Sequence, residues 1–96
     1  MHMAIRRYKV IPGAMEQITQ QVTTGFVPII SGTPGYVGYY LIDTGNDTLV
    51  TVSIFQDQAG TEESTRRAAD FVRANMASLV DGPPDVSMGT VRVKNP

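Results

Sequence analysis

The chain has 96 residues, of which 42% are hydrophobic and 18% are charged, with a formal net charge of -1 at pH 7. We interpret residues 1–96 as a single domain with a thin core, because a chain of this size buries about 60–65% of the surface that it exposes when unfolded. The near-neutral charge argues against nucleic acid or a membrane as a partner. The chain has no cysteine, which excludes disulfides and thiolate metal sites and favours a cytoplasmic location.

The N-terminal part of the chain predicts a strand followed by a helix. Residues 4–11 are rich in β-branched and aromatic types and precede a Pro-Gly turn, as is typical of a strand. Residues 1–3 are interpreted as a cloning remnant or a disordered end. Apolar residues then recur at spacings of four, four and three, which predicts one buried helix face: Ile18, Val22, Phe26 and Ile29. Because Gly25 and Pro28 are poor residues for a helix interior, we expect the helix to loosen near Gly25.

Residues 36–43 and 48–55 predict two strands joined by a tight turn, and nearly every residue in them is apolar or aromatic. A strand with one face in water alternates apolar and polar side chains, so this pair is expected to be covered on both faces. Helices can supply one of the two covers. The other cover must come from a different source.

Residues 57–80 predict a second helix with Asp57 as its N-cap. The two prolines of "DGPPD" end it, and residues 86–93 predict a last strand. The buried face of this helix is predicted at four apolar positions: Ala68, Val72, Met76 and Leu79. Its exposed face carries acid-first pairs four residues apart, worth about 0.3–0.5 kcal/mol each: Glu62 with Arg66, and Glu63 with Arg67.

The order strand, helix, strand, strand, helix, strand predicts an α+β, ferredoxin-like βαββαβ fold. In this plan two helices cover one face of a four-stranded antiparallel sheet. The other face would then expose a large apolar patch, which a monomer rarely tolerates. The simplest cover is a second copy of the chain, so we expect a homodimer formed through the sheet face.

Three stretches make the chain resemble a known group of proteins: "YKVIPGAMEQI", "PGYVGYYLID" and "TVSIFQDQAGTEES". They look like the dimeric α+β barrel proteins grouped with the antibiotic biosynthesis monooxygenases, and the resemblance covers nearly the whole chain. It implies a small hydrophobic or aromatic ligand held between sheet and helices, with quinol-like or polyketide substrates in some relatives. Other relatives degrade haem, and many have no known activity.

The chain departs from this group at two positions. Relatives often have a tryptophan at the end of the third strand and a histidine about nine residues later, where this chain has Phe55 and Ser64. The chain has no tryptophan, and its one histidine is His2. Ser64 therefore lacks a base, and haem ligation is unsupported. We expect no catalytic residue, cofactor or metal to be identifiable, and any activity to be at best monooxygenase-like and cofactor-independent.

A competing motif is the Asp43-Thr44-Gly45 triplet, which also occurs in aspartic proteases of the retroviral, homodimeric type. In those enzymes two aspartates share a proton across the dimer axis. The late segment of such proteases is missing here, and the two predicted helices do not fit them. The triplet is better interpreted as the start of a hairpin turn, because glycine and asparagine tolerate positive φ.

The candidate ligand site follows from strand alternation, which places Arg6, Tyr8 and Val10 on one face. A buried cation needs a partner. Either Arg6 and Tyr8 bind an anionic or phenolic ligand, or Arg6 pairs with a carboxylate and Tyr8 fills the core, which is the favoured reading. The expected ligand-binding set is Arg6, Tyr8, Phe26, Ser53, Ser64 and Ala68. Two functions stay open: binding or oxidation of a small aromatic, quinol-like ligand, and a non-catalytic ligand-binding or structural dimer.

Overall fold

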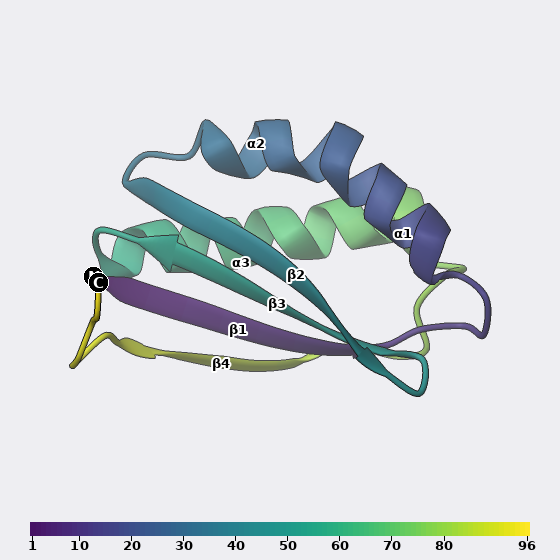
Figure 1. Cartoon of the computed structure of the whole chain (residues 1–96). Helices are drawn as coiled ribbons and strands as arrows, with labels where there is room; N and C mark the ends of the chain where they lie inside the picture. The colour runs from purple at the N-terminus through teal and green to yellow at the C-terminus, as the bar shows by residue number, and fades with distance from the viewer.

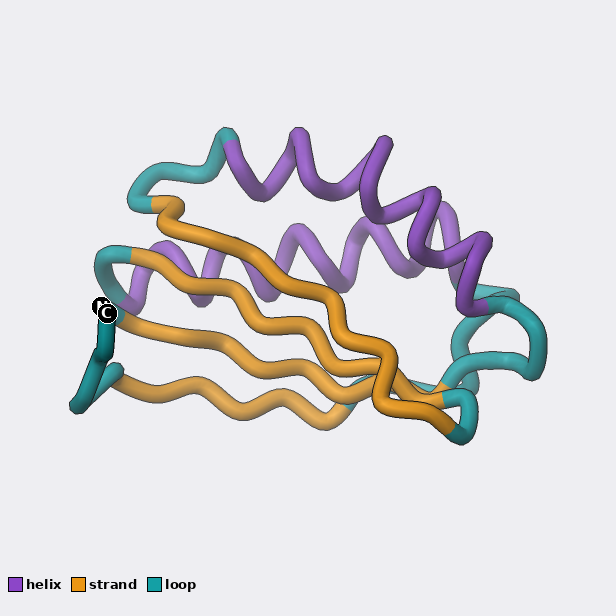
Figure 2. The backbone as a smooth tube through the Cα atoms, in the orientation of Figure 1, coloured by secondary structure: helices purple, strands orange, loops and turns teal.

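The computed structural model describes residues 1–96 and contains one antiparallel sheet with the strand order β2-β3-β1-β4 (Figure 1). Its strands are β1 (His2–Lys9), β2 (Tyr36–Gly45), β3 (Thr48–Phe55) and β4 (Asp85–Thr90). All helices lie on one side of this sheet (Figure 2). The ferredoxin-like βαββαβ fold is therefore confirmed. No helix has the length and apolar character needed to cross a membrane.

Strand β1 lies at the centre of the sheet, between β3 and β4. It begins at His2, which pairs with Phe55, and Met3 pairs with Ile54. The disordered end considered for residues 1–3 is therefore wrong for these two residues, because they belong to the central strand. Strand β4 stops at Thr90, earlier than the predicted 86–93.

The first helical layer consists of α1 (Met15–Gln21), the π-helical turn η1 (Val22–Phe26) and α2 (Val27–Ser31), which follow one another without a break. The expected loosening near Gly25 takes the form of this wider turn. A π-turn takes one more residue than an α-turn, so side chains after it change face. As a result Ile30 is buried and Ile29 is 39% exposed, which corrects the predicted Ile29.

The second helical layer consists of α3 (Gln58–Phe71) and the π-helical turn η2 (Val72–Met76). Asp57 caps α3 as predicted, since its Oδ1 accepts a hydrogen bond of 3.0 Å from the Gly60 N–H. The predicted pair of Glu62 with Arg66 is wrong. Glu62 accepts a hydrogen bond from Gln58 instead, and Glu63 pairs with both Arg66 and Arg67.

The core fills the space between the helices and the inner sheet face, and it is built from strands and helices alike. The opposite, outer face has no cover within the chain. Register pairing places seven apolar side chains on it: Met3, Ile5, Tyr40, Ile42, Val50, Val52 and Ile54. We call this set the outer face; Tyr40 is 60% exposed and Ile42 47%. The strands are therefore apolar on both sides, as their sequence indicates.

Candidate functional site

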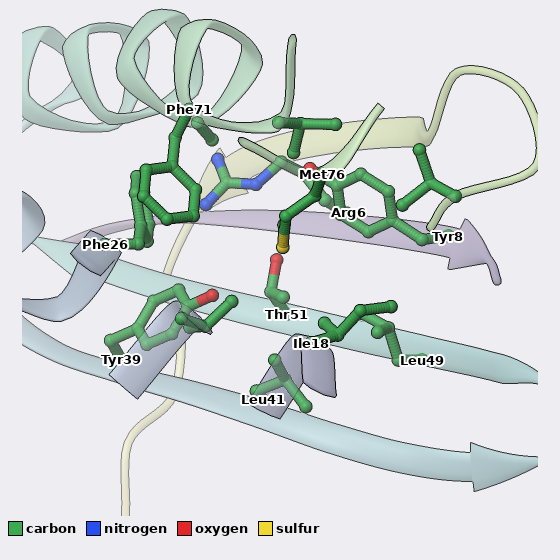
Figure 3. Close-up of a pocket in the computed structure, with 14 residues that line it drawn as sticks. Arg6, Tyr8, Ile18, Phe26, Tyr39, Leu41, Leu49, Thr51, Phe71 and Met76 are labelled. Atoms are coloured by element: carbon green, nitrogen blue, oxygen red, sulfur yellow. The ribbon is translucent and has the colours of Figure 1, made fainter. Parts of the chain in front are cut away.

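A small cavity of about 30 Å³ lies inside the core, between the sheet and the two helical layers (Figure 3). That is room for about one or two water molecules. Apolar side chains from every layer form most of its wall, including Phe26, Leu41, Leu49 and Phe71. The polar exceptions are Arg6 and Thr51 together with the tyrosine hydroxyls. The cavity by itself is too small for an aromatic ring.

A larger, open groove of about 340 Å³ lies beside the cavity. It runs between the second helical layer and the β1–β4 side of the sheet, and the Gly82-Pro83-Pro84 segment forms one end. Cavity and groove share four wall residues: Arg6, Tyr8, Val72 and Val80. This groove was not predicted from the sequence, although the "DGPPD" break between the helix and the edge strand is a signal for an opening there.

Arg6 is the most unusual residue of the site, because its charged side chain is only 2% exposed. Its guanidinium donates one hydrogen bond of 2.7 Å to Ser53 Oγ and another of 3.1 Å to Thr65 Oγ1. Both partners are neutral. Figure 3 shows the guanidinium extending from β1 toward the ring of Phe71, beneath the second helical layer.

The expected pairing of Arg6 with a carboxylate is wrong. The three ion pairs of the structure join exposed or half-exposed helix residues, and none includes Arg6. The strand register gives the reason. The neighbour of Arg6 on β4 is Val86 and its neighbour on β3 is Thr51, so neither strand offers an acid on the inner face. The acid of β4, Asp85, lies opposite Arg7, whose side chain is on the outer side.

Two tyrosines lie near this cation, of which Tyr8 is buried and Tyr39 is partly buried. Burial raises the pKa of Tyr8, and the positive charge of Arg6 opposes that shift. Burial also raises the pKa of Tyr39 to about 12, again against the effect of Arg6. Burial lowers the pKa of Arg6, because desolvation disfavours its charged form. Both phenols thus stay protonated at neutral pH and cannot neutralise the guanidinium.

The raised pKa of Tyr39 predicts a loss of stability in alkali. Between pH 10.0 and about 12 the unfolded chain releases this proton while the folded chain keeps it. The free energy of unfolding is unaffected by Tyr39 below this window and falls within it, by about 1.4 kcal/mol per pH unit. Tyr39→Phe should remove this part of the slope in urea titrations across the window. Parallel stability curves for variant and wild type would contradict the burial of this phenol.

Thr51 supplies a further polar group without a partner. Its hydroxyl is buried and makes no hydrogen bond of good geometry within the chain, although the Tyr39 side chain lies close enough to interact with it. Figure 3 shows it directed toward the sulfur of Met76, into the cavity. A buried polar atom left unpaired costs about 1–3 kcal/mol, so such an atom invites a bound water or ligand.

The other predicted site residues divide into two groups. Phe26 and Ala68 line the cavity together with Arg6 and Tyr8. Ser53 reaches the site only through its hydrogen bond with Arg6, and it does not line either hollow. Ser64 is fully buried beside the helix backbone, where its hydroxyl donates to the Thr61 carbonyl. The structure therefore does not bring the two serines into the cavity wall.

The protease alternative is wrong. The side chain of Asp43 accepts a hydrogen bond of 2.9 Å from the Gly45 N–H, within its own hairpin. The next residues, Asn46 and Asp47, have φ values of 53° and 55°, which form the hairpin turn between β2 and β3. The triplet therefore closes an exposed turn of this sheet.

The two π-helical turns both border the cavity. Val22 and Phe26 are the ends of η1, Val72 and Met76 are the ends of η2, and all four line the cavity. Single π-turns inside α-helices occur frequently at functional sites. Their position here makes the cavity the part of the core where both helices depart from regular geometry.

Comparison with known proteins agrees with the fold described above. Residues 1–74 match the sequence profile of the family described as antibiotic biosynthesis monooxygenase. No curated protein matches the chain. A protein of unknown function from Nitrosomonas europaea superposes with a TM-score of 0.83 at 19% identity, over 98% of this chain and 91% of the other.

Two relatives with named activities share the fold. A monooxygenase of Streptomyces coelicolor, in complex with nanaomycin D, has a TM-score of 0.79 at 18% identity, over 98% of this chain and 89% of the other. SnoaB, a cofactor-independent oxygenase of Streptomyces nogalater, has a TM-score of 0.75 at 15% identity, over 99% and 96%. At these identities the likeness concerns the fold alone.

Proposed function

Because the chain belongs to the antibiotic biosynthesis monooxygenase family, we propose that it binds a small planar aromatic ligand of quinol or quinone type. The ring lies in the groove, and its polar edge meets Arg6 and Tyr8. The observation that carries this proposal is that groove and cavity share these two residues as a common wall. The groove, at about 340 Å³, falls within the range of small-molecule sites, about 300–1,000 Å³.

The nature of the walls supports an aromatic ligand. Val72, Val80 and Val86 give the groove apolar surfaces, and Tyr8 adds an aromatic ring with a hydroxyl. Such a mixture of apolar surface and a few polar groups is typical of small-molecule sites. The Streptomyces coelicolor relative in complex with nanaomycin D is consistent with a ligand of this class.

A ligand-binding role without turnover is the second candidate. No histidine or carboxylate lines the cavity or the groove, so the site offers no ordinary general base. Chemistry would have to come from the ligand and dioxygen, with Arg6 and the tyrosine hydroxyls as the protein's contribution. Oxygen uptake in the presence of a reduced naphthohydroquinone, above the rate of its autoxidation, would separate an oxygenase from a ligand-binding protein.

Binding can be tested with 2-methoxy-1,4-naphthoquinone, a neutral planar probe. The chain has no cysteine, so covalent thiol addition to the quinone does not interfere. At one hundred times its dissociation constant the probe should stabilise the protein by about 2.7 kcal/mol, read as a rise in melting temperature. Absence of a rise at saturating probe would contradict the proposed site.

A matched pair of variants locates the binding. Ala69 lines the groove, whereas Ala74 is an exposed residue of the same helical layer that lines neither hollow. Ala69→Phe should fill the groove and weaken probe binding at least tenfold, and Ala74→Phe should leave it unchanged. Equal binding by the two variants would place the probe elsewhere.

We also propose that a second copy of the chain covers the outer face. Side chains such as Tyr40 and Ile42 are too exposed for a stable monomer surface of this kind. Two such faces packed across a two-fold axis would bury both sets at once. The groove and the cavity lie on the opposite side of the sheet, so each protomer would keep its own ligand site.

A further inference from the structure

We infer that the ligand of the proposed site is an anion and that Arg6 is its counter-ion. This inference rests on the proposed function and narrows it, because it assigns the charge of the ligand and the atom group that meets it. It starts from the burial of Arg6 in a place where the chain provides no negative charge.

The buried charge of Arg6 is uncompensated within the chain. The side chain is 2% exposed, and its two hydrogen bonds end on the neutral hydroxyls of Ser53 and Thr65. Buried charges are ordinarily paired, because an unpaired one has lost its hydration without regaining an opposite charge. A positive charge held in this way attracts an anion from solution.

The groups that face Arg6 from each packed element do not supply that anion. Tyr8 on β1 and Tyr39 on β2 have raised pKa values and stay neutral. The helix above contributes Thr65. Arg73, at the groove, is a second cation; its partner Asp70 is exposed and paired with it at 2.8 Å. The surroundings of Arg6 are therefore neutral or positive.

The anion is best matched by an ionised hydroxyl on a planar ring. The cavity of about 30 Å³ has room for about one water-sized group, so it can take an oxygen but not a ring. The unpaired hydroxyl of Thr51 lies in the same cavity. A phenolate or enolate meets both conditions, because its ring can pack against Val72, Val80 and Val86 of the groove. A phosphate has no apolar surface to place against these side chains.

The test compares two probes with the same ring system that differ in charge and in one methyl group. 2-Hydroxy-1,4-naphthoquinone is an acidic enol that is ionised at neutral pH, and 2-methoxy-1,4-naphthoquinone is its neutral methyl ether. Calorimetric titration of the full chain should give a dissociation constant about ten to one hundred times lower for the hydroxy compound, as expected for hydrogen bonds to a charged group. The preference should vanish below the pKa of the free ligand.

Variants of Arg6 assign the preference to this residue. Arg6→Met keeps an unbranched apolar stem, shorter than that of arginine, and removes the charge, so the two probes should bind equally. Arg6→Lys should retain a preference for the ionised probe. Arg6→Met removes an unpaired buried charge but leaves the buried Ser53 hydroxyl without its hydrogen-bond partner, so its melting temperature in the absence of ligand should stay close to that of the wild type.

The outcomes separate the two proposals. Equal binding of both probes by the wild type would overturn the counter-ion role and leave aromatic binding intact. Failure of both probes to bind would overturn the proposed function and this inference together. A preference that persists in Arg6→Met would assign it to another cation, and the inference would fall. If the wild type binds both probes equally well and Arg6→Met has a lower melting temperature than the wild type, Arg6 is a structural residue.

Discussion

The variant Val52→Asp is expected to sediment as a monomer at micromolar concentration, where the wild type sediments as a dimer. Val52 lies on β3, near the middle of the outer face, with Ile5 and Tyr40 opposite it on the two neighbouring strands. In a dimer joined through this face the new carboxylate would be buried without a partner. Such a group costs several kcal/mol per chain, so dissociation should increase by at least a thousandfold.

Two controls make this result specific. Gln17→Asp adds the same charge to an exposed position in the first turn of α1, where an acid is favourable, and it should remain dimeric. The far-ultraviolet circular dichroism of Val52→Asp should match that of the wild type, because Asp on an exposed sheet surface disturbs the fold little. A monomeric wild type would contradict the proposed assembly at once.

The largest loss of stability is expected from Gly60→Ala. An added Cβ would lie 2.5 Å from Cδ2 of Phe55 and within 2.8 Å of two further atoms of that side chain. Phe55 is fully buried and packs edge-on against Tyr36, so it has little freedom to move. We expect the free energy of unfolding to fall by about 1–3 kcal/mol, although alanine alone favours a helix over glycine.

Gly89→Ala is the matched control, because a Cβ at Gly89 would meet no atom within 4 Å. It should change stability little or raise it slightly through the lower entropy of its unfolded chain. For a domain of this length each kcal/mol corresponds to about 4–8 °C in melting temperature, so the two variants should be easily separated. Equal melting temperatures would show that α3 can shift away from β3 at no cost.

Most of the fold was predictable from local sequence signals. The Pro-Gly turns, the Asp57 cap and the "DGPPD" break mark where elements begin and end, and these signals depend on neighbouring residues alone. Alternation along β1 correctly placed Arg6 and Tyr8 together on the buried side. Side chains alternate between the two faces of a strand, so identifying the face of one residue assigns all the others.

The parts that could not be predicted depend on tertiary context. Ile29 was chosen over Ile30 because an α-helical period was assumed, and the π-turn η1 changes that period. Leu79, predicted on the buried face of the second helix, does pack against the core, but it lies beyond the end of that helix at Met76. Arg6 lacks a carboxylate partner because none of the three strands and the helix packed around it places an acid there. No spacing within one segment of sequence can report that absence.

The two π-turns also have a consequence for how the chain can vary. Ile18, Val22, Phe26 and Ile30 all point inward at a constant spacing of four, which a regular α-helix would not sustain. Deleting Thr24, an exposed residue of the widened turn, would change the spacing to four, three and four, the ordinary α-helical pattern. The same inward residues would remain, on a shorter helix. Deletions inside a helix are usually disruptive. Here a deletion can change the shape of the cavity between sheet and helices while the same residues still form its wall.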